Sequence, residues 1–552
     1  MWVVRAADGK QFKGDETDVV QDDEVLTSAL SNCDGNRRLR CSAAVSSVLE
    51  RAAKAMSRPT SWVSTSVAIS VLLLVIAVGY REWSSTDAAH PRSTFNNVFS
   101  DHLKSEISQV IVTTPPPPPP VGTSSAPCSG HGAIEVDYET GLHSCRCHQC
   151  FTGRDCSSTD NGCTVDAYQG DPTMFEQYWM HNGDESSTTE IFGWQQLSYY
   201  ANSKQFFFVQ TQLDQVIRRL HDVVGNAVTD GRHIVIGVGS TQLLQAALYA
   251  LSSPPSLGSS TTTPMSVVSE APYYSAYPMQ TDYLKSGLYR WAGDAAKFKQ
   301  STSEVDDAAY IELITSPSNP TGEIRQAVVN GTRGVLVHDL AYYWPHYVPI
   351  TAPADDDLML FTMSKNTGHA GTRIGWAIVK DLDVAKRMAK FIELNSIGVS
   401  KDAQIRATQI LRSVIMAYKG DDRMLDERTM SGAVEVHAES KQGLFHFGAS
   451  EMAYRWRRLR YALALGVRFS LLPEFESAYC AFFKQTRTTT PAFAWLRCNE
   501  EEDCEKFLGL HGILTRGGVH FGAEASFVRI SMVDRRSTFE ILIDRLEALE
   551  RG

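Results

Sequence analysis

Four short apolar runs in the C-terminal two thirds of the chain each lead into polar residues. They are His233–Val238, Tyr310–Thr315, Val335–His338 and Leu358–Thr362. Continuous apolar runs of this length are typical of strands in a parallel sheet that is covered on both faces. Helical segments such as Leu243–Leu251 lie between them and can supply the covering layers. The pattern therefore predicts an α/β fold with a mostly parallel sheet.

Polar residues that follow three of these runs are expected to lie close together. Asn319, Asp339 and Lys365 come after the last three strands. Ligands of open α/β sheets bind beyond the carboxyl ends of the strands, so the three side chains should meet in one crevice. Each has a structural alternative, because lysines after strands are usually solvated and an aspartate can cap a helix.

A glycine-containing turn, Gly237–Gln242, joins the first strand to the helix that follows it. Free N–H groups and the helix dipole make such a helix N-terminus a binding site for anions. The turn lacks the third glycine of the dinucleotide-binding pattern. By itself it could also be a plain strand–helix connection.

The N-terminal part contains a long uncharged stretch between Arg58 and Arg81, 22 residues in length. A helix of this length covers roughly 30 Å, the thickness of a bilayer core. Trp62 and Tyr80 lie near its ends, where aromatic rings prefer the membrane interface. A buried helix of a soluble domain is the alternative, and a cleaved signal peptide would begin nearer the N-terminus. We predict a transmembrane anchor at residues 61–80.

Basic residues on the two sides of this anchor predict its orientation. Six precede it between Arg37 and Arg58, whereas only Arg81 and Arg92 follow closely. The positive-inside rule then leaves residues 1–60 as a cytosolic, mostly disordered tail and places the rest in the lumen. Residues 81–127 form a stalk that contains six consecutive prolines, a stiff extended spacer. We expect a single-pass protein of the endomembrane system, with the endoplasmic reticulum as the leading location.

Six cysteines are crowded into residues 128–163. A segment this short cannot bury enough surface to fold without cross-links. A zinc site is the alternative, because Cys147 and Cys150 have ligand spacing and histidines lie nearby. The lumenal side favours oxidation, so we predict a disulfide module and no metal site. Asn330 begins an Asn-Gly-Thr glycosylation sequence that only a lumenal domain could use.

Composition limits the classes of function that fit this chain. Of its 552 residues 43% are hydrophobic and 21% charged, so most of the chain can bury a core. The net charge of −11 disfavours a nucleic-acid-binding role.

A lysine, an aspartate, an asparagine and an anion site in one crevice suit pyridoxal 5'-phosphate. The lysine amine forms a Schiff base with the cofactor aldehyde, and an aspartate keeps the pyridine nitrogen protonated. A helix N-terminus and cations hold the phosphate, and an aromatic ring covers the pyridine ring.

Seven motifs in collinear order carry a family resemblance. They are GSTQLLQAALYAL (239–251), APYYSAY (271–277), SPSNPTG (316–322), HDLAYYWPHY (338–347), MSKNTGHAGTRIGW (363–376), NSIGVSKDAQ (395–404) and VRISM (528–532). The chain resembles the plant tryptophan aminotransferase-related and alliinase family, and its cysteine module resembles the EGF-like domain found in front of that family. The resemblance covers about residues 128–552. It implies a pyridoxal-phosphate-dependent transferase domain of fold type I at 164–552, with a large domain built on the sheet and a smaller α/β domain.

The resemblance also implies roles for single residues around the cofactor ring. Lys365 matches the Schiff-base lysine, which also moves a proton at the substrate Cα. Asp339 matches the partner of the pyridine nitrogen, and Asn319 and Tyr342 match the groups that bond the phenolic oxygen. Tyr274 matches the ring-stacking aromatic, although Tyr274 could be core filler, with the neighbouring Tyr273 in that role.

The phosphate and the substrate have implied contacts of their own. The implied phosphate contacts are Ser240, Thr241, Gln242, Ser364 and Arg373. Arg529 matches the arginine that binds the substrate α-carboxylate, with a structural salt bridge as its alternative. Tyr199 matches a tyrosine that reaches the phosphate of a neighbouring subunit, so a homodimer is expected.

Spacing alone allows 15 pairings of the six clustered cysteines. The resemblance implies Cys128–Cys145, Cys147–Cys156, Cys150–Cys163 and, near the C-terminus, Cys498–Cys504.

The resemblance implies an L-amino-acid aminotransferase. The leading reaction converts L-tryptophan to indole-3-pyruvate with pyruvate or another 2-oxo acid as acceptor, the first step of an auxin pathway. The enzymatic alternative is an alliinase-like C–S lyase acting on cysteine sulfoxides, because the cofactor residues do not distinguish the two reactions. A non-catalytic, EGF-bearing binding protein is the alternative of another class.

Overall fold

The computed structural model describes residues 3–5, 11–13 and 127–551, without 138, 161, 183–185, 202–205, 253–263, 302–308 and 419–442. Strands β1 (Val3–Arg5) and β2 (Gln11–Lys13) form an antiparallel pair in a unit separate from the one that contains 127–551. The predicted anchor at 61–80 and nearly all of the predicted tail and stalk lie outside the described residues. Within the described part, every helix is too short or too polar to span a membrane.

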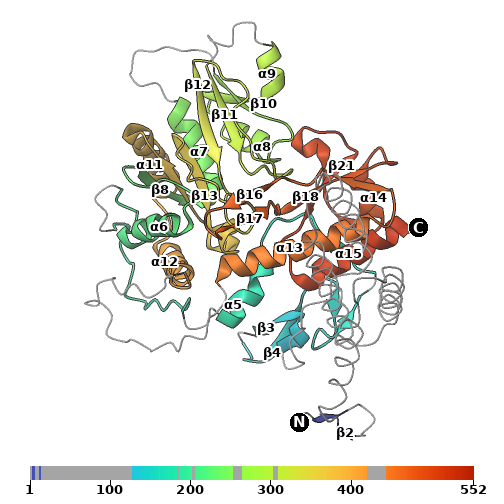
Figure 1. Cartoon of the computed structure of the whole chain (residues 1–552). Helices are drawn as coiled ribbons and strands as arrows, with labels where there is room; N and C mark the ends of the chain where they lie inside the picture. Colours follow the sequence, from blue (N-terminus) through green and yellow to red (C-terminus); the bar gives the residue numbers. More distant parts are fainter. Residues whose placement is uncertain are drawn as a thin grey trace, which may run out of the picture. The chain divides into compact units, whose positions relative to one another are not determined.

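A mixed sheet of seven strands forms the centre of the larger domain (Figure 1). Its spatial order is β10-β9-β11-β12-β13-β14-β8, and only β14 runs antiparallel to its neighbours. The strands are β8 (His233–Val238), β9 (Met265–Ser269), β10 (Tyr289–Asp294), β11 (Tyr310–Thr315), β12 (Gly334–Asp339), β13 (Leu358–Thr362) and β14 (Ile374–Val379). This sheet matches the predicted, mostly parallel architecture.

The predicted strands agree with the structure closely. β8, β11 and β13 have the predicted bounds, and β12 extends one residue further at each end. The helix after β8 begins earlier than predicted, because α7 (Gly239–Ser252) starts directly at the strand end. The apolar run of β14 was not predicted as a strand.

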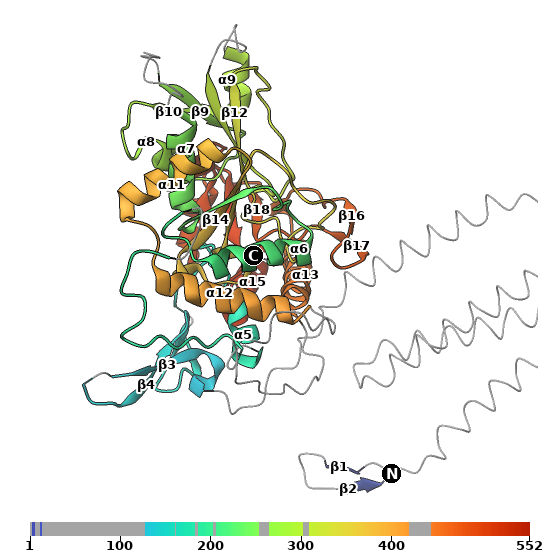
Figure 2. The same ribbon diagram turned by 90° about the vertical axis from the view of Figure 1, so that its left-hand side faces the viewer.

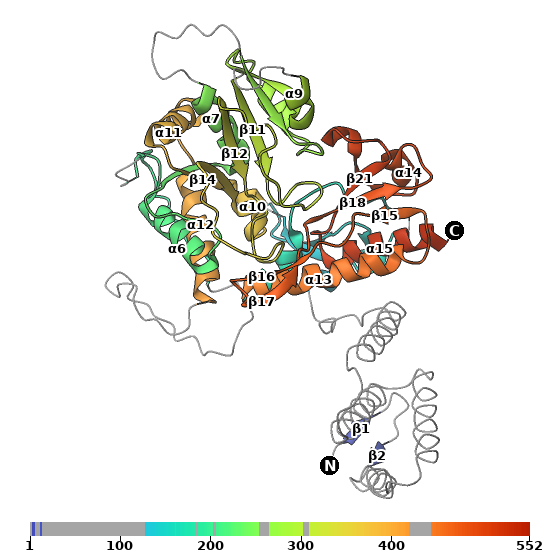
Figure 3. The same ribbon diagram turned by 45° about the horizontal axis from the view of Figure 1, so that its top comes forward.

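Helices cover both faces of this sheet (Figure 3). On one face α7 packs against α11 (Leu382–Ser396), and on the other α6 (Thr211–Val224) packs against α12 (Lys401–Met416). The buried Trp376 of β14 donates its indole N–H to His221 of α6, 2.9 Å away. Neighbouring residues of a strand point to opposite faces, so Gly375 faces α7, where a Cβ would lie 2.7 Å from the backbone of Gly239 and Ser240.

The smaller domain is built on an antiparallel sheet with the order β15-β18-β21-β20. Helices α13 and α15 run side by side against it (Figure 1). These elements are β15 (Phe469–Leu471), β18 (Phe493–Cys498), β20 (Arg516–Gly517), β21 (Phe527–Ser531), α13 (Leu444–Leu463) and α15 (Arg536–Arg551).

The cysteine module consists of two small hairpins beside α5 (Glu176–Asn182) (Figure 2). The hairpin strands are β3 (Gly132–Val136), β4 (His143–Cys147), β5 (Phe151–Thr152) and β6 (Ser158–Thr159). Its disulfides are Cys128–Cys145, Cys147–Cys156 and Cys150–Cys163, the three pairs that the resemblance implies.

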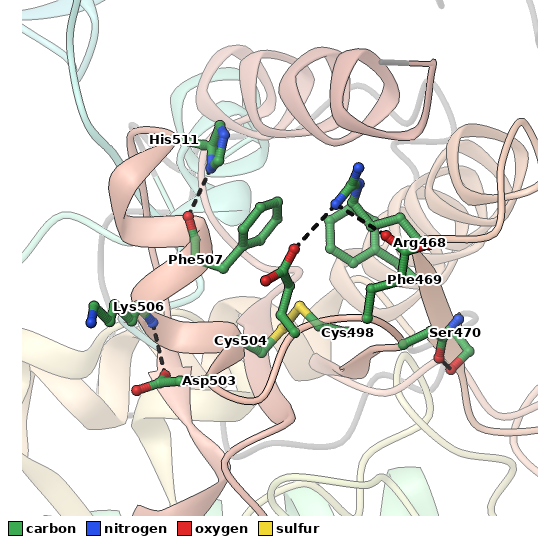
Figure 4. The surroundings of a disulfide bond; sticks show 12 residues. Arg468, Phe469, Ser470, Cys498, Asp503, Cys504, Lys506, Phe507 and His511 are labelled. Atoms are coloured by element: carbon green, nitrogen blue, oxygen red, sulfur yellow. Dashed lines mark hydrogen bonds and ion pairs between the residues drawn. A yellow bond between two sulfur atoms is a disulfide. The ribbon is translucent and has the colours of Figure 1, made fainter.

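A fourth disulfide, Cys498–Cys504, lies in the smaller domain and also matches the expected pair (Figure 4). It joins the end of β18 to the first residue of α14 (Cys504–Leu510). Asp503 caps that helix by accepting a hydrogen bond from the Lys506 backbone N–H at 3.0 Å. Both cysteines are buried, so the bond fixes the helix to the sheet from inside.

The chain enters the smaller domain directly after the module. β7 (Val165–Asp166) pairs in parallel with β19 (Ile513–Leu514), and Ala167 accepts a hydrogen bond from Ser531 of β21. This pairing places the next residues, 168–171, between the two domains.

The other described elements are η1 (Pro127–Gly130), η2 (Thr173–Phe175), α8 (Tyr277–Asp282), α9 (Ala295–Ser301), α10 (Met363–Asn366), η3 (Ala370–Thr372), β16 (Ser477–Cys480), β17 (Gln485–Thr488) and η5 (Gly518–Phe521).

Candidate active site

A cavity of about 340 Å³ lies between the strand ends of the large sheet and the smaller domain. Ten of the twelve residues predicted to bind cofactor or substrate line it. These are Ser240, Thr241, Tyr274, Asn319, Asp339, Tyr342, Ser364, Lys365, Arg373 and Arg529. The expected convergence at the carboxyl ends of the strands is therefore present.

Lys365 stands on α10, the single turn of helix that follows β13. The Thr362 hydroxyl caps this turn by accepting a hydrogen bond from the Ser364 N–H at 3.2 Å. The Lys365 Nζ donates to the carbonyl oxygen of Gly170 at 2.5 Å. Burial lowers the pKa of Lys365 to about 8, although the carboxylate of Asp171 opposes this shift. An amine with such a pKa is partly neutral near physiological pH and can act as a nucleophile.

Asp339 ends β12 and lies half-buried at the cavity wall. Tyr277 donates its hydroxyl to Asp339 Oδ2 at 3.0 Å, and the Ala341 N–H lies 3.2 Å from Oδ1. Burial nevertheless raises the pKa of Asp339, because these neutral donors only partly replace water. A carboxylate in this position is stabilised by a cationic partner, such as a protonated ring nitrogen.

The start of α7 provides a binding site for an anion in the same cavity. Ser240 and Thr241 stand in its first turn, where backbone N–H groups have no partner within the helix. Gly239 has φ of 69°, and a Cβ there would lie 2.5 Å from Nη2 of Arg373. Glycine thus lets the guanidinium approach the helix N-terminus.

Gln242 is not among the residues that line the cavity, and its expected part in the phosphate site stays a prediction. Its Oε1 accepts a hydrogen bond from the Val238 N–H at 2.8 Å. Its Nε2 donates to Asn395 Oδ1 and Ser396 Oγ at 3.0 and 3.1 Å. Because α7 begins at Gly239, Gln242 faces α11 and fixes the turn.

Tyr199 also lies outside the cavity, and 67% of its surface is exposed. An exposed position is compatible with a contact to a second subunit, so its expected role stays a prediction. Tyr274 lines the cavity, whereas Tyr273 packs against Trp291 and does not. Of the two candidates for ring stacking, Tyr274 is the one in place.

Arg529 reaches the cavity from β21 of the smaller domain. Its Nη2 donates to the carbonyl oxygen of Tyr168 at 2.5 Å and its Nη1 to Asn319 Oδ1 at 3.2 Å. The guanidinium stacks on the ring of Phe493 at 4.0 Å. Burial lowers the pKa of Arg529 to about 10, so it remains charged at neutral pH. No carboxylate among the described residues pairs with it, which argues against the structural salt bridge considered as its alternative.

Several residues that line the cavity could not be identified from sequence patterns. Tyr277 belongs to a motif that was recognised, but its contact with Asp339 depends on how α8 packs. Gly170 and Asp171 follow β7, which has only two residues, and Arg516 stands on a strand of the same length. Such short strands carry no periodicity.

Residues 165–550 match the family model described as allinase. The chain belongs to this family. It is 50% identical to tryptophan aminotransferase-related protein 2 of Oryza sativa subsp. japonica over 404 residues, 72% of this chain and 76% of the relative. The protein of the same name in Arabidopsis thaliana is 50% identical over 68% of this chain and 79% of its own length. Alliin lyase of Allium cepa var. aggregatum is 35% identical over 76% of this chain and 90% of that protein.

Enzymes of this family depend on pyridoxal 5'-phosphate, and the cavity fits that cofactor. Two features of the cavity carry this fit: the close approach of Arg373 to the start of α7, and the carboxylate of Asp339, which has no ion-pair partner among the described residues. Lys365 would hold the cofactor covalently. Asp339 would face the ring nitrogen, and Arg373 with the α7 N-terminus would hold the phosphate.

Proposed function

We propose that the protein is an L-amino-acid aminotransferase that converts L-tryptophan to indole-3-pyruvate, the first step of an auxin pathway, with a 2-oxo acid as acceptor. The observation that carries the proposal is the convergence of Lys365, Asp339, Arg373 and Arg529 on one cavity. These are the groups that a pyridoxal-phosphate enzyme acting on an amino acid needs.

Two further observations support tryptophan as the donor. The relatives at 50% identity are named tryptophan aminotransferase-related proteins. The cavity is also rich in aromatic rings, with Tyr168, Tyr274, Tyr342 and Phe493 in its lining. Aromatic side chains pair favourably with an indole ring.

The cofactor, when bound, supplies an electron sink for the bond broken at the substrate Cα. The chain's own residues do the rest. Arg529 binds and orients the α-carboxylate. The ring of Phe493 packs against the guanidinium and fixes its orientation. The neutral Nζ of Lys365 would take the proton from Cα and deliver it to the aldehyde carbon of the cofactor, as its lowered pKa allows. Asp339 would keep the cofactor's ring nitrogen protonated.

A C–S lyase acting on cysteine sulfoxides is the second candidate, favoured by the 35% identity to alliin lyase over 90% of that protein. Lys365, Asp339 and Arg529 would serve that reaction equally well, because both reactions begin with loss of the Cα proton. The two differ in what leaves the substrate.

The test uses the full chain, produced where disulfides form and loaded with the cofactor. It is mixed with L-tryptophan and pyruvate and, separately, with an S-alkyl-cysteine sulfoxide. Indole-3-pyruvate and alanine, formed only when the oxo acid is present, would support the aminotransferase. Pyruvate and ammonia released from the sulfoxide without an oxo acid would show that the lyase reading is right instead.

We further propose that the catalytic part lies in the lumen of the endoplasmic reticulum, held by the anchor at 61–80. The four disulfides support an oxidising compartment, because such bonds are rare in the cytosol. Asn330 is exposed in the turn between β11 and β12, as a glycosylation acceptor must be. A loss of mass on treatment with an endoglycosidase, absent in Asn330→Gln, would test this placement.

We propose a homodimer in which Tyr199 reaches the site of the partner. Its segment exposes four other large hydrophobic residues, which a second subunit could cover; they are Phe192, Trp194, Leu197 and Tyr200. Sedimentation of the purified chain and of Tyr199→Ala would give their oligomeric states. Cofactor titrations of the same two proteins would give their cofactor affinities.

A further inference from the structure

The catalytic lysine stands on a helix that is too short to satisfy its own carbonyl groups. α10 has four residues, and after it the Thr367 N–H bonds the Met363 carbonyl oxygen at 3.4 Å. The last carbonyl groups of a helix have no donor within the helix itself. The Lys365 carbonyl therefore needs a donor from elsewhere in the fold, because an interior backbone group without a partner is costly.

His346 supplies that donor. Its Nε2 lies 3.2 Å from the Lys365 carbonyl oxygen. A carbonyl oxygen can only accept, so this hydrogen bond requires the imidazole proton on Nε2. The other ring nitrogen, Nδ1, is buried and has no partner among the described residues. In that part of the chain the imidazole thus makes a single hydrogen bond, and it goes to the backbone of the catalytic lysine.

The imidazole is held in place by aromatic rings from two other segments. It stacks on Phe445 of α13, with centroids 5.6 Å apart and planes at 7°, and meets Phe175 of η2 at 5.4 Å and 86°. A Cβ on Gly448 would lie 3.1 Å from the Cβ of His346, so this glycine lets α13 approach closely. Burial lowers the pKa of His346 to about 3, so the ring stays neutral and carries one N–H.

His346 does not line the cavity, but it belongs to the segment that carries Asp339 and Tyr342, which do. Its hydrogen bond ties α10 to this segment. We propose that His346 is a positioning residue: its Nε2–H fixes the peptide group of Lys365 and so holds the amine in place relative to the carboxylate of Asp339. This inference rests on the cofactor chemistry of Lys365, which the proposed aminotransferase and the alternative lyase share.

The first experiment compares His346→Gln with His346→Asn. A glutamine amide nitrogen can reach the position of Nε2, whereas the shorter asparagine ends near the position of Nδ1. In His346→Asn, kcat should fall about 10- to 100-fold, the range for a slightly misplaced catalytic group. KM for the amino acid should not change, because Arg529 is untouched. His346→Gln should recover most of kcat. Equal kcat in the two variants, per folded molecule, would overturn the proposal.

A second experiment needs no substrate and does not depend on which reaction the protein catalyses. Pyridoxal 5'-phosphate is added to the cofactor-free protein at about pH 9, where most of Lys365 is deprotonated, and the visible absorbance of the bound cofactor is followed. The rate of uptake should be about tenfold lower in His346→Asn than in the native protein and should recover in His346→Gln. If the protein proves to be a lyase, the proposed reaction fails but this pattern still holds. Equal uptake rates in the two variants would refute the role of His346.

A third comparison separates positioning from stability. His346→Phe keeps an aromatic ring against Phe445 and removes the N–H. His221→Phe is the matched control, because His221 is also fully buried but bonds Asn226 and Trp376 instead. Both changes should lower the melting temperature, and only His346→Phe should lower kcat and the rate of cofactor uptake. Equal losses of kcat in the two variants would mean that His346 acts through stability alone. If either variant does not fold, the glutamine and asparagine pair decides the question.

Discussion

The two walls of the cavity hold their charged side chains in different ways. On the large-domain wall, Lys365 donates to the Gly170 carbonyl and Asp339 accepts from Tyr277, so each charged group has a positioned partner. On the small-domain wall, Arg529 donates to Tyr168 and Asn319, and Arg516 donates to Ser275. The buried Nε of each arginine has no partner in the described part of the chain.

This difference corresponds to two kinds of ligand. A cofactor that stays bound can be met by a wall whose side chains are fixed in advance, which lowers the cost of reorganisation. Substrates exchange in every cycle, and the charged arginine on the small-domain wall is expected to bind their α-carboxylate. Variants of the large-domain wall should therefore disturb the cofactor, and variants of the small-domain wall should disturb substrates alone.

The largest effect is expected for Lys365→Ala on the large-domain wall. Activity should fall by about 10⁴-fold or more, because the general base is lost together with the covalent link to the cofactor. The visible absorbance of the bound cofactor should be lost as well. Lys386→Ala, an exposed lysine of α11, serves as the control. Near-normal turnover in the Lys365 variant would contradict the proposed chemistry.

Arg529→Lys tests the small-domain wall. The lysine keeps the charge but loses the bidentate contact, so KM for amino acids should rise about 100-fold. Cofactor absorbance should not change, and Arg497→Lys should behave like the native protein. A shift in the cofactor spectrum of the Arg529 variant would show that the small-domain wall also affects the cofactor, contrary to this prediction.

The pH dependence of cofactor uptake reports on Lys365. Burial places its folded-state pKa at about 8, below the usual 10.5, so the amine is protonated and unreactive below pH 8. The rate of uptake by the cofactor-free protein should rise about tenfold per pH unit up to pH 8 and then level off. Stopped-flow absorbance would measure it. A rise that continues to pH 10 would mean that Lys365 titrates like a solvated lysine.

The smallest effect is expected from the Cys498–Cys504 disulfide behind the small-domain wall. Replacing both cysteines by serine should lower the free energy of unfolding by about 2 kcal/mol, the chain-entropy value for a loop of this size. Because β18 carries Phe493 beneath Arg529, KM should rise a few-fold while the cofactor spectrum stays the same. Urea unfolding and steady-state kinetics would measure both. Cys128→Ser with Cys145→Ser, in the module, should leave KM unchanged.

The large-domain wall could be read from the sequence and the small-domain wall only in part. Asp339 and Lys365 follow apolar runs long enough to identify as strands, and their flanking motifs are distinctive. Arg529 was found through its motif, but Arg516 stands on a strand of two residues, which no periodic pattern reveals. The direction of the Gln242 side chain was equally hard to predict, because the starting residue of a helix decides which way its fourth residue points.

The sequence by itself determined the buried strands and most of the residues that line the cavity, because those depend on local patterns and short motifs. The cysteine pairs were implied only by the family resemblance, since spacing alone leaves 15 pairings open. Only the tertiary structure decided that β14 runs antiparallel, that residues 168–171 close the cavity and that Arg516 faces Arg529. These features depend on pairing between segments far apart in the chain, and the register of such pairs is set by packing rather than by local sequence.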